Sequence, residues 1–283
     1  MWDNHSEYAK NQIDKFVLIM ERSIDNFAPL KMETITTLME KLPNWTEDQI
    51  VSTWYEIAIR KAFYASKIIN DIPLNVIQNI NSDNLLATTT KYRVPPLKLC
   101  NQVLQASGFL EKTVDKMIRD PHNLSNEKIR EFICLALQND LDTPVTWRWL
   151  RNKSREFEKQ LEDLFRTLGL SFKVEIELMN EQIGQYGRSI ATPDILFNET
   201  HTIVVSHPDG RITRHPVNWI DAKSYIFTGR KNVLEQLEKQ AQSYISLFGP
   251  GAFIFQYGFI NTINIENVVF LSDPLITWNN KKI

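Results

Sequence analysis

Through the first half of the chain, hydrophobic residues recur every three or four positions, which is the spacing of one buried face of an α-helix. Residues 6–24 show the pattern, with Ile13, Phe16, Val17 and Met20 on one face. The same spacing predicts further helices at 29–41, 47–69, 95–104, 110–119 and 125–137. We therefore expect an all-α N-terminal region, in which short helices around tight connections are compatible with a helix-turn-helix.

Helix-start signals support three of these elements. Pro29 opens the second helix, because proline is favoured in the first turn. Thr46 and Gln49 form a capping box at the start of the third helix. Ser125 is expected to cap the last one.

The hydrophobic pattern changes in the second half. After one more helix at 145–168, apolar and polar residues alternate at 170–176, as in a half-buried strand. A polar loop that contains glycine leads to a strand at 191–197, and Pro208-Asp209-Gly210 marks a hairpin. The other predicted elements are strands at 201–205, 211–215, 217–224 and 252–259 and an amphipathic helix at 231–247. The expected fold class is α+β, with the all-α region followed by an α/β core.

Glycine usage separates the two halves of the chain. Eight of the nine glycines lie from Gly169 onward, where turns between strands are expected. We place the boundary between Thr143 and Pro144, so that 1–143 forms a helical domain and 144–283 an α/β domain. A chain of 283 residues is long enough for two domains that each bury a core.

Composition narrows the functional classes. The chain is 43% hydrophobic and 23% charged, which is typical of a globular protein and not of a disordered one. Its net charge of −2 gives no overall attraction to nucleic acid, so such binding would need a local basic patch. Cys100 and Cys134 form neither a zinc motif nor a disulfide framework. We expect no signal peptide and no membrane span, because the apolar stretch at 251–260 is too short.

Candidate chemistry lies at the ends of two predicted strands. Pro193-Asp194 places a carboxylate where an apolar strand begins, and Asp221-Ala222-Lys223 places a carboxylate and an amine two positions apart. Residues two apart on a strand point to the same side, so Asp221 and Lys223 project together. Two carboxylates suit Mg²⁺ beside a phosphate, and a lysine can stabilise the phosphate charge or orient water.

An ordinary alternative exists for this triplet, because acidic-x-lysine sequences arise often by chance. Asp221 and Lys223 could simply form a surface ion pair on an edge strand. No other lysine in the chain has Asp or Glu two positions earlier, however, and this triplet follows an apolar strand. The context therefore favours a functional site over a chance pair.

Together, Pro193-Asp194, Asp221-Ala222-Lys223 and the order of elements resemble the PD-(D/E)xK nuclease superfamily, whose restriction-endonuclease-like core runs α-β-β-β-α-β. The resemblance implies a glutamate on the first core helix, for which Glu158 fits best because it lies beside the apolar positions of that helix. Glu156 and Glu162 are rivals, and a solvated helix charge is the alternative for each. Gln240 matches the glutamine of resolvase-like members, although it could be ordinary polar surface.

A narrower resemblance is to the codanin-interacting nuclease family. It rests on Met117–Pro121, Leu170–Phe172, Thr192–Asp194, Trp219–Ser224, Gln240–Tyr244, Phe248–Gly251 and Tyr257–Phe259. This family resemblance implies helix-turn-helix modules followed by a nuclease domain. It also implies a Mg²⁺ or Mn²⁺ cofactor held by Glu158, Asp194 and Asp221, a DNA or RNA substrate, and association with codanin in erythroid chromatin biology. We therefore expect the protein in the nucleus and cytoplasm.

Basic residues give modest support for a nucleic-acid ligand. Trp147 to Arg155 is a basic and aromatic run that could grip phosphates and stack on bases, although we favour the interpretation of an amphipathic helix whose tryptophans pack between the domains. Arg230-Lys231 begins the helix that carries Gln240, where basic residues do not favour helix stability. His201, His207 and His215 lack metal-ligand spacing and are expected on the surface.

Three functional hypotheses follow. The first is a metal-dependent nuclease with Glu158, Asp194, Asp221, Lys223 and Gln240 at its centre. The second is a nuclease-fold module with weak or no catalysis that binds a protein such as codanin. The third is sequence-specific DNA binding by the N-terminal helices, which their acidic residues disfavour; these are Glu33, Glu40, Glu47 and Asp48.

Overall fold

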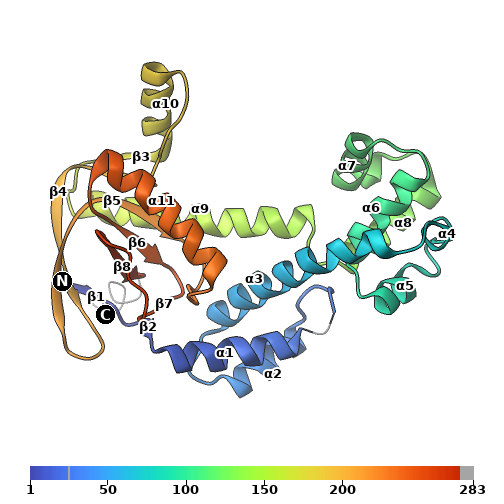
Figure 1. Cartoon of the computed structure of the whole chain (residues 1–283), viewed down its shortest axis with the longest axis horizontal. Helices are drawn as coiled ribbons and strands as arrows, with labels where there is room; N and C mark the ends of the chain where they lie inside the picture. Colours follow the sequence, from blue (N-terminus) through green and yellow to red (C-terminus); the bar gives the residue numbers. More distant parts are fainter. Residues whose placement is uncertain (25, 275–283) are drawn as a thin grey trace. The chain divides into compact units, whose positions relative to one another are not determined.

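The computed structural model describes residues 1–24 and 26–274 as a mixed α+β protein (Figure 1). Contacts divide the chain into a helical unit, Leu18–Leu150, and a sheet unit that joins Met1–Val17 to Arg151–Ile283. The division thus falls after Leu150, inside helix α9 (Pro144–Thr167), and not at the expected boundary between 143 and 144. The first 17 residues also group with the sheet unit and not with the helices that follow them. Residues 275–283 of the expected second domain lie outside the described residues.

Helices make up the described part of the helical unit. It contains the end of α1 (Lys10–Ser23), α2 (Met32–Lys41), α3 (Glu47–Ser66), η1 (Lys67–Asp71), α4 (Leu74–Ile77), α5 (Leu85–Tyr92), α6 (Pro96–Ala106), α7 (Glu111–Arg119), η2 (Pro121–Asn123), α8 (Glu127–Gln138) and the start of α9. The all-α nature expected of residues 1–143 is confirmed for the described residues from Leu18 onward, whereas strands β1 (Trp2–Asp3) and β2 (Glu7–Tyr8) lie before them. Across the described residues, no helix is long and apolar enough to cross a membrane.

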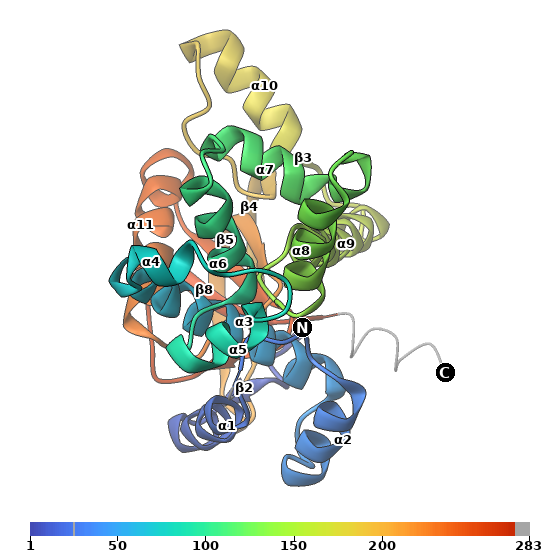
Figure 2. The ribbon, with the colours of Figure 1, turned by 90° about the vertical axis from the view of Figure 1, so that its right-hand side faces the viewer.

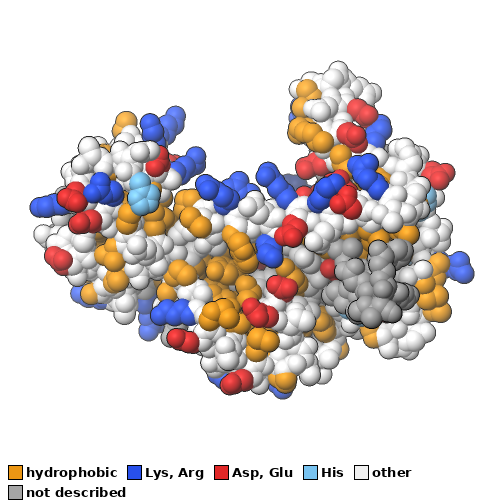
Figure 3. All heavy atoms as spheres, turned by 180° about the vertical axis from the view of Figure 1, so that it is seen from behind, with side chains coloured by type: hydrophobic (Ala, Val, Ile, Leu, Met, Phe, Trp, Pro, Cys, Tyr) orange, Lys and Arg blue, Asp and Glu red, His pale blue; other side chains and the backbone are white. Residues whose placement is uncertain are grey.

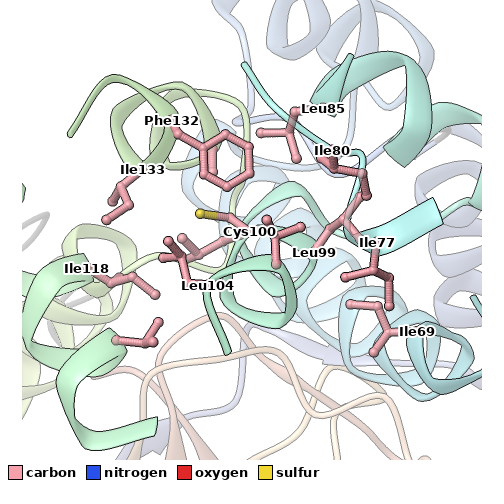
Figure 4. Packing of buried hydrophobic residues seen from close by; sticks show 14 of the residues in the cluster. Ile69, Ile77, Ile80, Leu85, Leu99, Cys100, Leu104, Ile118, Phe132 and Ile133 are labelled. Atoms are coloured by element: carbon pink, nitrogen blue, oxygen red, sulfur yellow. The ribbon is translucent and has the colours of Figure 1, made fainter. Parts of the chain in front are cut away.

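Helix α6 lies at the centre of one hydrophobic core of this unit. Leu99, Cys100 and Leu104 of α6 are buried among side chains of the neighbouring helices, including Phe132 and Ile133 of α8 (Figure 4). Burial raises the pKa of the Cys100 thiol to about 12, which keeps it protonated and unreactive. Both cysteines are free thiols, in agreement with the absence of a disulfide framework.

The helix-start signals were only partly read correctly. The capping box of Thr46 and Gln49 is confirmed, with the Gln49 N–H donating to Thr46 Oγ1 at 3.2 Å and the Thr46 N–H to Gln49 Oε1 at 2.9 Å. The cap of α8 is Asn126 and not Ser125, since Asn126 Oδ1 accepts from the Ile129 N–H. The second helix begins at Met32, three residues after Pro29.

The described part of the sheet unit has eight strands, six in a main sheet and two in a second one. It contains β1 (Trp2–Asp3), β2 (Glu7–Tyr8), β3 (Phe172–Val174), α10 (Glu175–Tyr186), β4 (Ile195–Ser206), β5 (Ile212–Lys223), α11 (Lys231–Phe248), β6 (Gly251–Phe255), β7 (Phe259–Ile260) and β8 (Val268–Ser272). The main sheet runs β1-β4-β5-β6-β8, with β3 also on β4, while β2 pairs with β7. The pairs β1–β4, β5–β6 and β6–β8 are parallel, and β3–β4 and β4–β5 are antiparallel.

Helices cover both faces of this sheet. Phe157, Leu161 and Phe165 of α9 share a core with Ile220 of β5 and Ile254 of β6. On the other face, the Trp219 ring lies 5.0 Å from the Tyr244 ring of α11 and 5.4 Å from the Phe253 ring of β6. Alternate residues of β5 therefore face α9 and α11, as the period of a strand requires.

Several elements of the sheet unit differ from expectation. The hairpin at Pro208-Asp209-Gly210 is confirmed, but each of its arms is one long strand, β4 or β5, where two short strands were expected. Of the expected strand 170–176, only Phe172–Val174 (β3) is a strand. The polar loop that was expected after it is largely helix α10. The start of the expected helix 6–24 is instead strand β2, and the expected strand 252–259 ends at Phe255. Strand β8 was not predicted.

The expectation of surface histidines was wrong for His207, whose side chain is only 11% exposed. His207 Nδ1 lies 2.7 Å from Glu7 Oε2, and its Nε2 lies 2.9 Å from Thr213 Oγ1. His215 Nε2 contacts the same hydroxyl at 2.8 Å. These contacts connect the N-terminal strand β2 to the far end of the β4–β5 hairpin.

Gly251 provides a test of how the sheet unit packs. An added Cβ there would lie 2.1 Å from ring atoms of Trp219, which is buried and donates from Nε1 to the Gly249 carbonyl at 2.9 Å. Because this ring has no room to move, Gly251→Ala should lower the free energy of unfolding in urea by about 1–3 kcal/mol.

The matched control is Gly184→Ala in the last turn of α10, where an added Cβ meets no atom within 4 Å. This change should stabilise the protein by up to about 1 kcal/mol, because alanine favours helix over glycine. Equal effects of the two substitutions would contradict the packing described at Trp219.

Candidate functional site

Asp194 and Asp221 lie across from each other at one end of the β4–β5 pair. Ile195 pairs with Ile220, so Asp194, one residue before β4, comes opposite Asp221 in the antiparallel register. Asp194 Oδ2 accepts a hydrogen bond from the Ala222 N–H at 2.6 Å. Directly opposed residues of an antiparallel pair share a face, so both carboxylates occupy the same side of the sheet.

Asp221, Lys223 and Gln240 form a closed hydrogen-bonded network. Lys223 Nζ is ion-paired with Asp221 Oδ1 and donates to Gln240 Oε1 at 2.9 Å. Gln240 Nε2 in turn donates to Asp221 Oδ2 at 2.8 Å. The Asp221 side chain is 6% exposed and that of Lys223 15%, so this pair is held out of bulk water. Gln240 thus joins the acid and the amine and fixes the position of each.

Tyr244 completes the contacts of Asp221. Its hydroxyl donates to Asp221 Oδ2 at 2.9 Å and accepts from Gln240 Nε2 at 2.8 Å. Tyr244 was not among the predicted site residues. It follows Gln240 by four positions on α11, and that spacing places two residues on the same helix face, which could have identified it.

Glu158 of α9 is the helix glutamate that reaches this centre. It is half-buried, and burial raises the pKa of its carboxyl, with repulsion from Glu175 and Asp221 acting in the same direction. Its two rivals lie elsewhere: Glu156 is exposed, and Glu162 is within 4.0 Å of Lys159 and 3.9 Å of Arg166. Direct contacts therefore join Asp194, Asp221, Lys223 and Gln240 in one place, while the charge of Glu158 adds to burial and Asp221 in raising the pKa of Asp194.

Glu175 is a further carboxylate that the sequence analysis did not identify. It is the first residue of α10, and its Oε1 lies 3.4 Å from the Thr192 hydroxyl. It was expected inside the strand 170–176, where nothing linked it to the site. Only the turn from β3 into α10 brings it close enough to Glu158 to repel that carboxylate.

The electrostatics of the site are dominated by excess negative charge. Burial, and then repulsion from Asp221, raise the pKa of Asp194 to about 8, although the Ala222 N–H and Lys223 favour the ionised form. Burial also raises the pKa of the Tyr244 hydroxyl, which therefore remains a hydrogen-bond donor. One lysine does not balance the surrounding carboxylates, so Asp194 holds a proton at neutral pH.

The donor types at this centre suit a hard divalent cation such as Mg²⁺ or Mn²⁺, which prefers carboxylate oxygens. Additional positive charge would also relieve the repulsion that keeps Asp194 protonated. Within residues 1–24 and 26–274, however, no three carboxylate, imidazole or thiol groups are arranged closely enough to form a ready metal-binding cluster. The residues therefore fit the cation in charge and donor chemistry, while Asp221 is paired with Lys223.

The fold and the site define a mixed α+β protein with carboxylates and a lysine gathered where two antiparallel strands meet. The chain belongs to the family described as "Protein of unknown function TPD sequence-motif", which matches residues 125–275. The one Thr-Pro-Asp sequence of the chain, Thr192-Pro193-Asp194, lies inside that match.

One relative is an uncharacterized protein of Acanthamoeba polyphaga mimivirus, which is 38% identical over 126 residues. The similar region is 44% of this chain and 42% of that protein, so it spans less than half of the relative's length. No solved structure matches the chain significantly.

The raised pKa of Asp194 predicts a pH-dependent stability difference in protein without divalent cations. Between about pH 4 and pH 8 the unfolded chain has lost this proton while the folded chain keeps it, so stability falls as pH rises. Asp194→Asn removes this loss and keeps an oxygen for the Ala222 N–H. In EDTA above pH 8, the variant should be more stable by at least about 1 kcal/mol, a rise of roughly 2–4 °C in Tm, with little difference at pH 4.

The control is Asp209→Asn at the tip of the hairpin, where a hydrogen bond from the Arg211 N–H lowers the pKa of an exposed carboxyl. This change should not raise Tm at any pH, because ionised Asp209 is favoured in the folded state. A Tm difference for Asp194→Asn that does not grow between pH 4 and pH 8 would contradict the electrostatics described here.

Proposed function

We propose that the protein is a Mg²⁺- or Mn²⁺-dependent nuclease that hydrolyses phosphodiester bonds of DNA or RNA. The observation that carries this proposal is the opposition of Asp194 and Asp221 with the Lys223 amine held beside them. Carboxylates attract a divalent cation, while an amine stabilises the charge of a reacting phosphate. The site thus combines carboxylates for the cation with an amine for the phosphate.

The order of elements also supports the proposal. Helix α9, strands β3, β4 and β5, helix α11 and strand β6 follow one another along the chain, with α10 inserted between β3 and β4. This is the α-β-β-β-α-β order of the PD-(D/E)xK nucleases that the motifs resemble. We accordingly propose a restriction-endonuclease-like core for the sheet unit and a relationship to the codanin-interacting nuclease family.

In this mechanism Lys223 is the residue that contacts the scissile phosphate or the attacking water. Its Nζ has three protons, of which Asp221 and Gln240 Oε1 engage two, and the third is available to an oxygen of the substrate. Gln240 acts as a positioning residue, because it holds both the amine and the carboxylate of the pair.

Asp194 and Asp221 would hold the cation, with Glu158 contributing directly or through water. When bound, the cation supplies Lewis-acid stabilisation of the phosphate charge and lowers the pKa of a water molecule. Asp194 must lose its proton to serve as a ligand, so cation binding should strengthen as pH rises toward about 8.

Cleavage of labelled single-stranded and duplex DNA and RNA in Mg²⁺ or Mn²⁺ tests the proposal. We expect metal-dependent cleavage by the wild type and a loss of at least about 100-fold in Asp221→Ala and Lys223→Ala, because each removes a charge at the reacting phosphate. Asp209→Ala, which removes an exposed aspartate at the hairpin tip, should cleave like the wild type. Cleavage that survives both site substitutions would rule out this centre.

A second function, as a protein-binding module with little or no catalysis, is favoured by helix α10. This helix extends away from the strands of its own unit (Figure 2), and hydrophobic side chains line it (Figure 3). Ile176, Ile183 and Tyr186 are 54%, 46% and 56% exposed and recur at helical spacing along one side. The resemblance implies codanin as the partner, in the nucleus and cytoplasm, and such a surface suits a protein.

A pull-down that measures how much of this protein codanin retains tests the binding function. Ile183→Asp should lose the partner, while Asp221→Ala should retain it, because the two substitutions affect separate surfaces. Gln185→Asp adds the same charge on the opposite side of α10 and serves as the control. Retention of codanin by both Ile176→Asp and Ile183→Asp would show that α10 is not the binding surface.

The helix-turn-helix that the resemblance implies for the helical unit stays a prediction. Helices α2 and α3 contain five acidic residues, two of which, Glu47 and Asp48, stand in the first turn of α3. We propose a core-building or protein-binding role for these helices, since acidic groups repel the phosphate backbone.

A further inference from the structure

A cluster of two histidines, a threonine and a glutamate lies at the opposite end of the β4–β5 pair from the candidate site. Glu7 Oε2 lies 2.7 Å from His207 Nδ1, and the Thr213 hydroxyl lies 2.9 Å from His207 Nε2 and 2.8 Å from His215 Nε2. The side chains of Glu7 and His207 are 7% and 11% exposed, so their contact is shielded from bulk water. The cluster thus joins β2 to the hairpin across 200 positions of the chain.

The donors and acceptors of this cluster suit a limited number of protons. An ionised carboxylate only accepts hydrogen bonds, so the contact with Glu7 requires a proton on His207 Nδ1. The Thr213 hydroxyl has one proton, which it can donate to one imidazole while its oxygen accepts from the other. All contacts are therefore satisfied when one of the two Nε2 atoms carries a proton and the other does not.

Protonation of both imidazoles breaks this pattern. The Thr213 hydroxyl proton then has no acceptor in the cluster, and two cations flank one oxygen atom. Like charges so close together repel each other, which makes the second proton costly. In agreement, burial and the charge of His207 lower the pKa of His215.

The other charged groups around the cluster do not offset a second positive charge. The cluster lines a cavity of about 330 Å³, and the charged or titratable residues among its described lining are Glu7, His207, Arg211 and His215. Glu7 is the only acidic one of these, and Arg211 adds positive charge. Asp209, in the hairpin turn, is exposed and ion-paired with Arg211. One carboxylate thus faces two imidazoles.

The cluster lies beside the hydrogen bonds that hold β2 on β7. The Phe259 and Asn261 N–H groups donate to the carbonyls on either side of Glu7, at 3.1 and 3.0 Å. Strand β1 is held independently of the cluster, because the Asn4 N–H donates to β4 and the Asn4 side chain to β8, through groups that do not titrate. Loss of the cluster contacts would therefore loosen β2 and leave β1 in place.

We propose that Glu7, His207, Thr213 and His215 form a pH-sensitive latch, which holds β2 against the β4–β5 hairpin at neutral pH and releases it when both imidazoles are protonated. Release frees N–H groups of β7, and a free strand edge can pair with another strand. With β2 released, the pKa of His215 returns to its ordinary value of about 6.5, whereas the latched form resists this proton. The stability of the latch is therefore complete above about pH 6.5 and falls as pH falls.

Hydrogen exchange of backbone amides in the full-length protein, measured between about pH 5 and pH 7.5, tests the latch. The rates are corrected for the pH dependence of the exchange reaction itself. Protection of the Phe259 and Asn261 amides should fall as pH falls below about 6.5, by up to about tenfold per pH unit for one proton. Protection of the Asn4 amide should not follow it, because no titrating group holds β1.

Substitutions within the cluster separate the latch from ordinary packing. His215→Gln can still bond to the Thr213 hydroxyl but cannot titrate, so the fall in protection should disappear. Thr213→Val keeps the branched shape and loses the hydroxyl, so protection at pH 7.5 should already be lower by about fivefold, whereas Thr213→Ser should preserve it. His122→Gln, which removes an exposed histidine of the helical unit, is the control and should behave like the wild type.

The latch is refuted if wild-type protection at β7 does not fall with pH, or if it falls equally in His215→Gln. It is also refuted if Thr213→Val protects these amides as well as the wild type does at pH 7.5. Parallel loss of protection at Asn4 would show that acid unfolds the sheet as a whole, which overturns the inference too. These results are independent of the nuclease assays, because no residue of the candidate site is changed.

Discussion

The antiparallel pairing of β4 with β5 forces two carboxylates, Asp194 and Asp221, into one poorly hydrated space. Like charges in such a place repel each other strongly, so at least one must be neutralised by a proton, a cationic side chain or a bound cation. Lys223 is ion-paired with Asp221, and the raised pKa of Asp194, about 8, favours the protonated form of that carboxyl at neutral pH. Under the proposed function, a bound divalent cation would take over this neutralisation from the lysine and the proton.

The rest of the sheet unit holds this pair in place. Trp219, two residues before Asp221, fills the space between β5 and α11 and leaves no room for a side chain at Gly251. That packing fixes α11, and α11 supplies the Gln240 amide and the Tyr244 hydroxyl that hold Asp221. The functional groups are therefore attached to rigid elements, which is the condition for a site to keep its geometry without a ligand.

How much of this could be predicted from sequence depended on the range of the interactions involved. Most helices and the Pro208-Asp209-Gly210 hairpin were predicted correctly, because periodicity, caps and turn residues act over a few positions. Strand β1 was missed because Trp2 pairs with Val205, about two hundred residues away. Helix α10 was predicted largely as a loop, because Gly184 weakens its helical signal. Its two ends do have local signals: the Val174 N–H donates to Glu177 Oε2 at the start, and Gly187 ends the helix in a left-handed conformation. The division of the chain fell inside α9 because a continuous helix gives no local signal of where contacts change partners.

For the candidate site, the sequence by itself determined which chemical groups were present and that Asp221 and Lys223 share one side of a strand, because that depends only on the strand period. It favoured Glu158 over Glu156 and Glu162 from the apolar positions of their helix, but how near each glutamate lies to Asp221 depends on the rotation of that helix against the sheet. The tertiary structure alone added Glu175, joined the Tyr244 hydroxyl to Asp221, placed Asp194 across from Asp221 and set the balance of charge among them. These properties arise from side chains far apart in sequence that share one low-dielectric space, and no local pattern of residues records such distances.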